Sequence, residues 1–222
     1  MNKKNIKISL IMNIVIFIMV SLATFFMFTG IKFMSDTEFL SDTGVTLFKY
    51  YTVDSNLFVG VASLLLIIYE ILLINKKIKS IPKYVYILKF IGTVAVTLTF
   101  MVTLFYLAPT YGSNFFFLYQ NANFFYHFLV PIISMISFIY YEKTKLDEKY
   151  IKYGLSTMIL YGIYYLINVL VHMENGKVSF EYDWYGFAGG GVITIIITIV
   201  LMLTITYLIS KVLFKKNQLK LR

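Results

Sequence analysis

The residue best placed for chemistry is a histidine inside an apolar stretch. His127 lies within a block from about 116 to 141, and Pro131 follows it four residues later. Proline has no N–H, so the carbonyl of His127 loses its helical partner and we expect the helix to bend there. Histidine accepts and releases protons near neutral pH. Because an ionisable side chain is costly in hydrocarbon, His127 marks a candidate polar pocket within the membrane.

Polar side chains share one helical face in three of the apolar blocks. At 3.6 residues per turn, each set falls on one side of its helix. The sets are Gln120, Asn123, His127, Ser134 and Ser137; Thr52, Ser55, Asn56 and Ser63; and Tyr161, Tyr164, Tyr165, Asn168 and His172. We expect the three faces to meet in a hydrated pocket that opens toward the outer leaflet or the extracellular side.

Structural roles compete with this interpretation for several residues. Thr52 opens its block, where threonine often caps a helix N-terminus. Asn123, Asn168 and the serines can instead join helices by hydrogen bonds inside the membrane. Glu70 lies near the other end of its block, where we expect it to pair with a lysine of the following loop.

The blocks that carry these residues are each long enough to cross a bilayer. The chain has 222 residues, of which 59% are hydrophobic. A hydrocarbon core of roughly 30 Å needs about 20 helical residues. Six apolar blocks meet this length, at about 8–33, 51–74, 84–108, 116–141, 153–171 and 191–214. We therefore predict an all-α integral membrane bundle of six transmembrane helices, with residues 1–222 forming a single domain.

Composition narrows the chemistry that such a bundle can perform. The chain has no cysteine, which excludes disulfides, thiolate nucleophiles and cysteine–metal sites, and its two histidines argue against a closed zinc site. We expect neither a metal nor a cofactor. The net charge of +9 arises from basic residues that cluster at the ends of the blocks, where they meet anionic headgroups. The expected partner is therefore the bilayer and not nucleic acid.

The distribution of lysines predicts the orientation. Basic residues crowd the N-terminus, the connections 75–83 and 142–152, and the C-terminal tail. The connections between these contain only Lys32, Lys49 and Lys177. Lysine-rich loops stay in the cytoplasm, so the alternation predicts a multi-pass protein of the cell membrane with both termini cytoplasmic.

Two short segments resemble the androgen-induced protein/FAR-17a family, whose bacterial branch consists of six-helix membrane proteins. The segments are Lys49-Tyr50-Tyr51-Thr52-Val53-Asp54-Ser55-Asn56 and His127-Phe128-Leu129-Val130-Pro131. A third segment, Trp184-Tyr185-Gly186-Phe187, is loosely similar to the aromatic segment before the family's last helix. Animal members of this family are multipass hydrolases of fatty acid esters of hydroxy fatty acids, and they use an intramembrane threonine and histidine.

The resemblance implies an intramembrane lipid-ester hydrolase or acyl-transfer enzyme, with Thr52 as nucleophile and His127 as general base. A threonine hydroxyl is a weak nucleophile until a neighbouring base removes its proton. Asn56 or Asn123 is then expected to donate a hydrogen bond to the oxyanion that forms on the ester. The predicted substrate-binding residues are Asn56, Asn123, Tyr164 and Asn168. The expected substrate is a lipid or lipid-like ester.

Two other functions remain open at this point. The chain has the size of a non-enzymatic six-helix subunit that captures the substrate of a small-molecule transporter. Such subunits usually dock their partner through small residues on the first helix, and the block 8–33 lacks a small-xxx-small pair. A member that has lost catalysis and only binds lipid is the third reading. A group that orients His127 is not evident, since Asp54 lies about 200° around the helix from Thr52.

Overall fold

The computed structural model of the chain describes residues 3–36 and 42–219. All of its regular elements are helical, with η marking 3-10 or π turns. In chain order they are α1 (Lys3–Thr29), η1 (Gly44–Lys49), α2 (Tyr51–Ile74), α3 (Lys83–Val102), η2 (Thr103–Leu107), α4 (Ala108–Thr110), η3 (Gly112–Tyr119), α5 (Asn121–Phe124), η4 (Phe125–Leu129), α6 (Val130–Tyr140), η5 (Glu148–Leu155), α7 (Ser156–Val171) and α8 (Val192–Leu219).

These elements form six segments that are long and apolar enough to cross a membrane. Within the described residues they are Lys3–Thr29, Tyr51–Ile74, Lys83–Thr110, Asn121–Tyr140, Glu148–Val171 and Val192–Leu219. The prediction of an all-α, six-helix membrane bundle is thus confirmed, and the chain is a multi-pass membrane protein.

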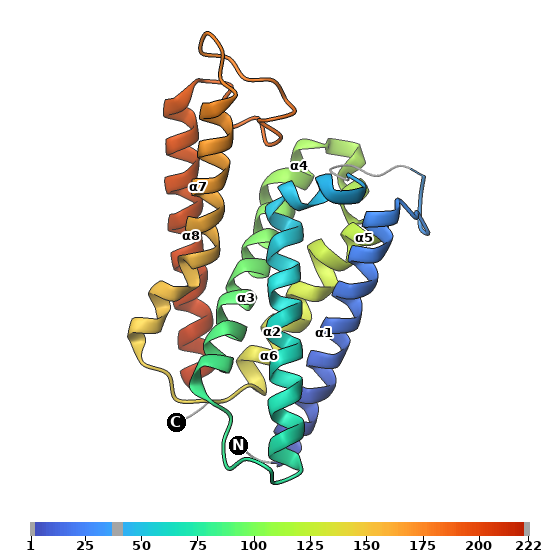
Figure 1. Ribbon diagram of the computed structural model, residues 1–222, viewed down its shortest axis with the longest axis vertical. Helices are drawn as coiled ribbons and strands as arrows, with labels where there is room; N and C mark the ends of the chain where they lie inside the picture. The colour runs from blue at the N-terminus through green and yellow to red at the C-terminus, as the bar shows by residue number, and fades with distance from the viewer. Residues whose placement is uncertain (1–2, 37–41, 220–222) are drawn as a thin grey trace.

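The third segment is the centre of the bundle. Helix α3 contacts α2, α6, η5, α7 and α8, while α1 packs against α2, α5 and α6. In Figure 1, α7 and α8 stand together as a hairpin on the far side of α3 from α1, and the start of α1 and the end of α8 lie at the same end of the bundle. An even number of crossings produces this arrangement.

Two glycines allow the first three helices to approach closely. A Cβ at Gly60 of α2 would lie 2.9 Å from Val20 Cγ1 on α1, and a Cβ at Gly92 of α3 would lie 2.9 Å from the Cα of Val59. Real side chains do not tolerate such distances, so only glycine permits these helix spacings. The close packing fixes α2 at Val59 and Gly60 against both of its neighbours.

The segment ends differ from the predicted ones where backbone conformation overrides hydropathy. The first helix ends at Thr29 and not at Phe33, because Gly30 adopts a left-handed φ of +73° and the N–H of Ile31 turns back to the Phe26 carbonyl. The fourth segment begins at Asn121 and not near Phe116, since the preceding residues form the separate turn η3.

Both prolines inside the bundle are preceded by a π turn. Pro109 follows η2 and Pro131 follows η4. A proline cannot donate to the carbonyl four residues earlier, and the wider π turn, with its i→i+5 bonding, accommodates the missing donor. The irregularity expected at His127 is therefore present as a π turn that contains His127 itself.

Candidate functional site

Thr52 and His127 line one small cavity at the end of the bundle where α2 begins. The cavity has a volume of about 20 Å³, which is close to the space that one water molecule needs. Its walls come from α1, α2, η2, α5, η4 and the connection before α8. The lining residues are Met27, Tyr50, Thr52, Val53, Leu107, Asn123, His127 and Tyr185.

The histidine is buried and held in one orientation. His127 is 2% exposed, and its Nδ1 lies 2.7 Å from the backbone carbonyl oxygen of Leu118 in η3. A carbonyl oxygen only accepts hydrogen bonds, so Nδ1 carries the proton. In a neutral imidazole the other nitrogen, Nε2, is then the acceptor. The site thus holds the histidine tautomer that serves as a base at Nε2.

The threonine does not cap its helix. Tyr50 occupies the N-cap position of α2 and no side chain bonds there, so the capping role considered for Thr52 is wrong. The Thr52 backbone carbonyl accepts bonds from Ser55 Oγ and Asn56 Nδ2. Its hydroxyl has no hydrogen-bond partner among the described residues. This hydroxyl is therefore available to a bound molecule.

A larger, mostly apolar cavity adjoins the small one. It has a volume of about 200 Å³ and lies between the start of α2, the end of the third segment, α7, α8 and the connection before α8. Thr52, Leu107 and Tyr185 line both cavities. The other lining residues are Tyr51, Leu98, Thr99, Val102, Thr103, Tyr106, Thr110, Met158, Tyr161, Phe187 and Met202. Thr52 therefore stands between the small cavity that His127 lines and an apolar chamber.

The connection 172–191 is folded over this end of the bundle. Asp183 is 6% exposed, and its carboxylate accepts bonds from the N–H groups of Phe187 and Ala188, each at 2.9 Å, and from the Tyr165 hydroxyl. These bonds turn Tyr185 toward the cavities, where its hydroxyl accepts a bond from the Tyr51 N–H. Burial raises the pKa of Tyr185 to about 12, so the phenol stays neutral.

Of the two asparagines proposed as oxyanion donors, the structure brings one to the cavity. Asn123 is buried and lines the cavity with Thr52 and His127. Asn56 is also buried, but it lines neither cavity, and its Nδ2 donates to the carbonyls of Thr52 (2.8 Å) and Tyr126 (3.3 Å). Asn56 holds the backbone at Thr52 in place, while Asn123 lines the small cavity.

The remaining predicted contacts lie away from this cavity. Tyr164 is exposed and lines a different hollow on the outside of α2 and α7, where Asp54 also lies. Asn168 donates to the carbonyl of Tyr182 at 2.7 Å and so anchors the connection after α7. Three polar faces do not converge as expected, because the face of α7 turns partly outward.

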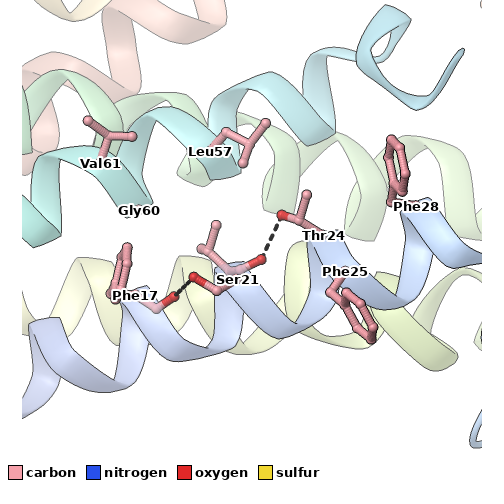
Figure 2. A pocket seen from close by; sticks show the side chains of 9 residues that line it. Phe17, Ser21, Thr24, Phe25, Phe28, Leu57, Gly60 and Val61 are labelled. Atoms are coloured by element: carbon pink, nitrogen blue, oxygen red, sulfur yellow. Dashed lines mark hydrogen bonds between the residues drawn. The ribbon is translucent and has the colours of Figure 1, made fainter. Parts of the chain in front are cut away.

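The furrow between α1 and α2 is larger but offers no chemistry. It has a volume of about 370 Å³. Figure 2 shows that its two hydroxyls turn back onto their own helix: Ser21 donates to the carbonyl of Phe17 at 2.8 Å, and Thr24 donates to that of Val20 at 2.7 Å. The rest of the furrow is lined by apolar side chains and by Gly60.

Three contributors to the site are not evident from the sequence. The Leu118 carbonyl is a backbone group, and no side-chain pattern marks it. Leu107 and Tyr185 reach the cavity through a π turn and a folded connection. Two signals were usable. Pro109 was one, since a proline at the end of an apolar block indicates an irregular turn before it, and the segment Trp184-Tyr185-Gly186-Phe187 was the other, since it contains Tyr185.

No family model, curated protein or solved structure matches this chain. The likeness to the androgen-induced protein family therefore rests on the short segments around Thr52 and His127 and on the looser match at Trp184-Tyr185-Gly186-Phe187.

Proposed function

We propose that the protein is an intramembrane hydrolase or acyl-transfer enzyme of lipid esters, with Thr52 as nucleophile and His127 as general base. One observation carries the proposal: a threonine and a histidine from different helices line the same cavity, and the histidine is held in the tautomer that leaves Nε2 as an acceptor. An unpaired hydroxyl that shares a cavity with such a base supports nucleophilic catalysis.

In this mechanism His127 Nε2 takes the proton of the Thr52 hydroxyl as Oγ1 attacks the ester carbonyl. The resulting oxyanion accepts a hydrogen bond from Asn123, whose side chain lines the same cavity. Collapse of the intermediate releases the alcohol, which takes its proton from the imidazolium. Water, activated by His127, then hydrolyses the acyl-threonine, and an acceptor alcohol in place of water gives acyl transfer.

The apolar chamber beside Thr52 is suited to the acyl chain. Its walls are mainly aliphatic and aromatic side chains, and it shares Thr52 with the small cavity. Its apolar walls suit a hydrocarbon chain that leaves the bilayer, because lipid tails are as apolar as these side chains. The ester carbonyl of such a chain then lies at Thr52.

We place the site on the outer side of the membrane and both termini in the cytoplasm. The lysine-rich connections lie at the end of the bundle opposite Thr52, and such loops remain cytoplasmic. Membership in the androgen-induced protein family is part of the same proposal, supported by the segments that contain Thr52 and His127.

Covalent labelling tests the nucleophile. The purified protein is treated with a fluorophosphonate bearing an alkyl chain, and the labelled peptide is identified by mass spectrometry. We expect the label on Thr52, with none on the Thr52→Ala variant. Labelling at another residue would contradict the assignment of Thr52 as the nucleophile. No labelling, alongside tight retention of an intact small molecule, favours a binding protein over an enzyme.

A further inference from the structure

A second group of polar side chains is buried at the other end of the bundle. Glu70 lies 18 residues after Thr52 on α2, or about 27 Å along the helix axis at 1.5 Å per residue. Seven side chains form this polar cluster, and each is fully or almost fully buried. They are Ser9 and Asn13 of α1, Ser63 and Glu70 of α2, Lys89 of α3, Ser137 of α6, and Glu142 just after α6.

Lys89 and Glu142 form the connected part of the polar cluster. Lys89 Nζ donates to Ser63 Oγ at 2.7 Å and lies 3.9 Å from Glu142 Oε1. The same carboxylate oxygen accepts bonds from Ser137 at 2.6 Å and from Asn13 at 3.0 Å. Four of the six segments thus meet at this ion pair. Glu70 does not pair with a loop lysine as expected; its neighbours are Lys89 and Glu142 inside the bundle.

The polar cluster nevertheless leaves several oxygens without a partner. Neither oxygen of Glu70 has a hydrogen bond of normal geometry, although Ser9 lies beside the carboxyl group, and Glu142 Oε2 and Asn13 Oδ1 are also unpaired. All of these unpaired atoms are oxygen acceptors. A buried acceptor without a partner costs about 1–3 kcal/mol, and more when it carries charge.

The charges of the polar cluster do not balance. Glu70 and Glu142 bring two carboxylates, whereas Lys89 brings one ammonium group, and both carboxylates interact electrostatically with it. Tyr86 of α3 is a further titratable group that faces the two acids. One more positive charge would neutralise this buried group. The described residues contain no set of three acidic, histidine or cysteine side chains that could hold a divalent metal.

We propose that the polar cluster binds one monovalent cation between Glu70, Glu142 and Asn13. Unpaired carboxylate and amide oxygens are the ligands that a hard cation takes, and a single charge completes the neutralisation that Lys89 begins. Na⁺ and a proton share this chemistry: Na⁺ would be coordinated by the oxygens together, while a proton would sit on Glu70 and bond to a neighbouring acceptor. The site lies apart from Thr52 and His127 and does not depend on their catalytic role.

The test compares the purified protein with two glutamate variants. Glu70→Gln keeps the size of the side chain and removes one negative charge. Glu148→Gln changes an exposed glutamate at the start of η5 and serves as the matched control. Thermal unfolding is followed while NaCl replaces choline chloride at constant ionic strength, and the infrared C=O band of protonated carboxyl groups is recorded with and without Na⁺.

Two results support the proposal and identify the cation. A melting temperature that rises to a plateau with Na⁺ in the wild type and in Glu148→Gln, but not in Glu70→Gln, assigns Na⁺. A protonated-carboxyl band that is independent of Na⁺ and missing only from Glu70→Gln assigns a proton. The proposal is overturned if the wild type shows neither effect, or if the effect persists in Glu70→Gln. Should Glu70→Gln not fold, Glu142→Gln takes its place in the same comparison.

Discussion

The His127 ring is held by the backbone of Leu118, nine residues earlier in the chain. The 2.7 Å contact between His127 Nδ1 and the Leu118 carbonyl oxygen selects the neutral tautomer with a free Nε2. In many enzymes a carboxylate orients the catalytic histidine, whereas the ring of His127 is held by a backbone carbonyl in a 3-10 turn. Asp54 does not serve, because it lies in a different hollow from His127.

Replacing His127 by asparagine separates its structural bond from its chemistry. The amide of His127→Asn can reproduce the Nδ1–H bond to Leu118, but it offers no base at the Nε2 position. We expect a melting temperature near that of the wild type and a loss of turnover of about 10²–10⁴-fold. In His127→Leu the Leu118 carbonyl is unpaired, which should cost about 1–3 kcal/mol of stability. Equal stability of the two variants would show that the bond to Leu118 is unimportant.

The two asparagines near the site should behave differently when each is changed to alanine. Asn123 lines the cavity, so Asn123→Ala should lower kcat by about 10²–10³-fold with little change in KM. Asn56 bonds to backbone carbonyls, so Asn56→Ala should reduce stability by roughly 0.6 kcal/mol for its interhelical bond. Steady-state kinetics and thermal unfolding of both variants test this difference between Asn123 and Asn56. A larger kcat loss in Asn56→Ala than in Asn123→Ala would move the oxyanion donor to Asn56.

Filling the apolar chamber should change which esters are cleaved. Met202 of α8 lines the chamber, whereas its neighbour Leu201 is 54% exposed on the outside of the bundle. We expect Met202→Trp to lower kcat/KM for long acyl chains more than for short ones. Leu201→Trp is the matched control and should leave the chain-length profile unchanged. A profile that is the same in both variants would place the acyl chain elsewhere.

Much of the architecture follows from the sequence because hydrocarbon thickness imposes a minimum length on each apolar run. The second segment has the predicted bounds, Tyr51–Ile74. The first ends earlier than predicted because hydropathy continues past Gly30, while the backbone at Gly30 turns out of the helix. Periodicity placed His127 and Asn123 on one face, and both do line the cavity.

The features that could not be predicted from the sequence depend on tertiary contacts. The contact of His127 with the Leu118 carbonyl cannot be predicted from side-chain patterns, because the carbonyl belongs to the backbone. The bonds of Asp183 could not be predicted either, because the connection that contains it carries no periodic pattern. Lys89 was available as a signal, since it is a charged residue inside an apolar block. Its partner Glu142 lies just after α6, in a segment that reads as a charged turn, so only the folded bundle shows that the two are buried together.

The proposed orientation can be measured with single cysteines, since the natural chain has none. Lys79→Cys and Lys145→Cys should react with membrane-impermeant maleimide only after the cells are opened. Ser113→Cys and Lys177→Cys should react in intact cells, because their connections carry few basic residues. The cysteine-free parent is the control for background. Two consecutive connections labelled from the same side would contradict the six-crossing orientation.

The most direct test of the catalytic proposal is the turnover of a lipid ester by Thr52 variants. Purified, monodisperse wild type, Thr52→Ser, Thr52→Ala and the double variant Thr52→Ala/His127→Asn are compared at the same concentration. We expect Thr52→Ser to keep measurable activity through its hydroxyl and Thr52→Ala to fall to background. The double variant should be no worse than Thr52→Ala, because the two residues act as one unit. Near wild-type turnover in Thr52→Ala would contradict the assignment of Thr52 as the nucleophile.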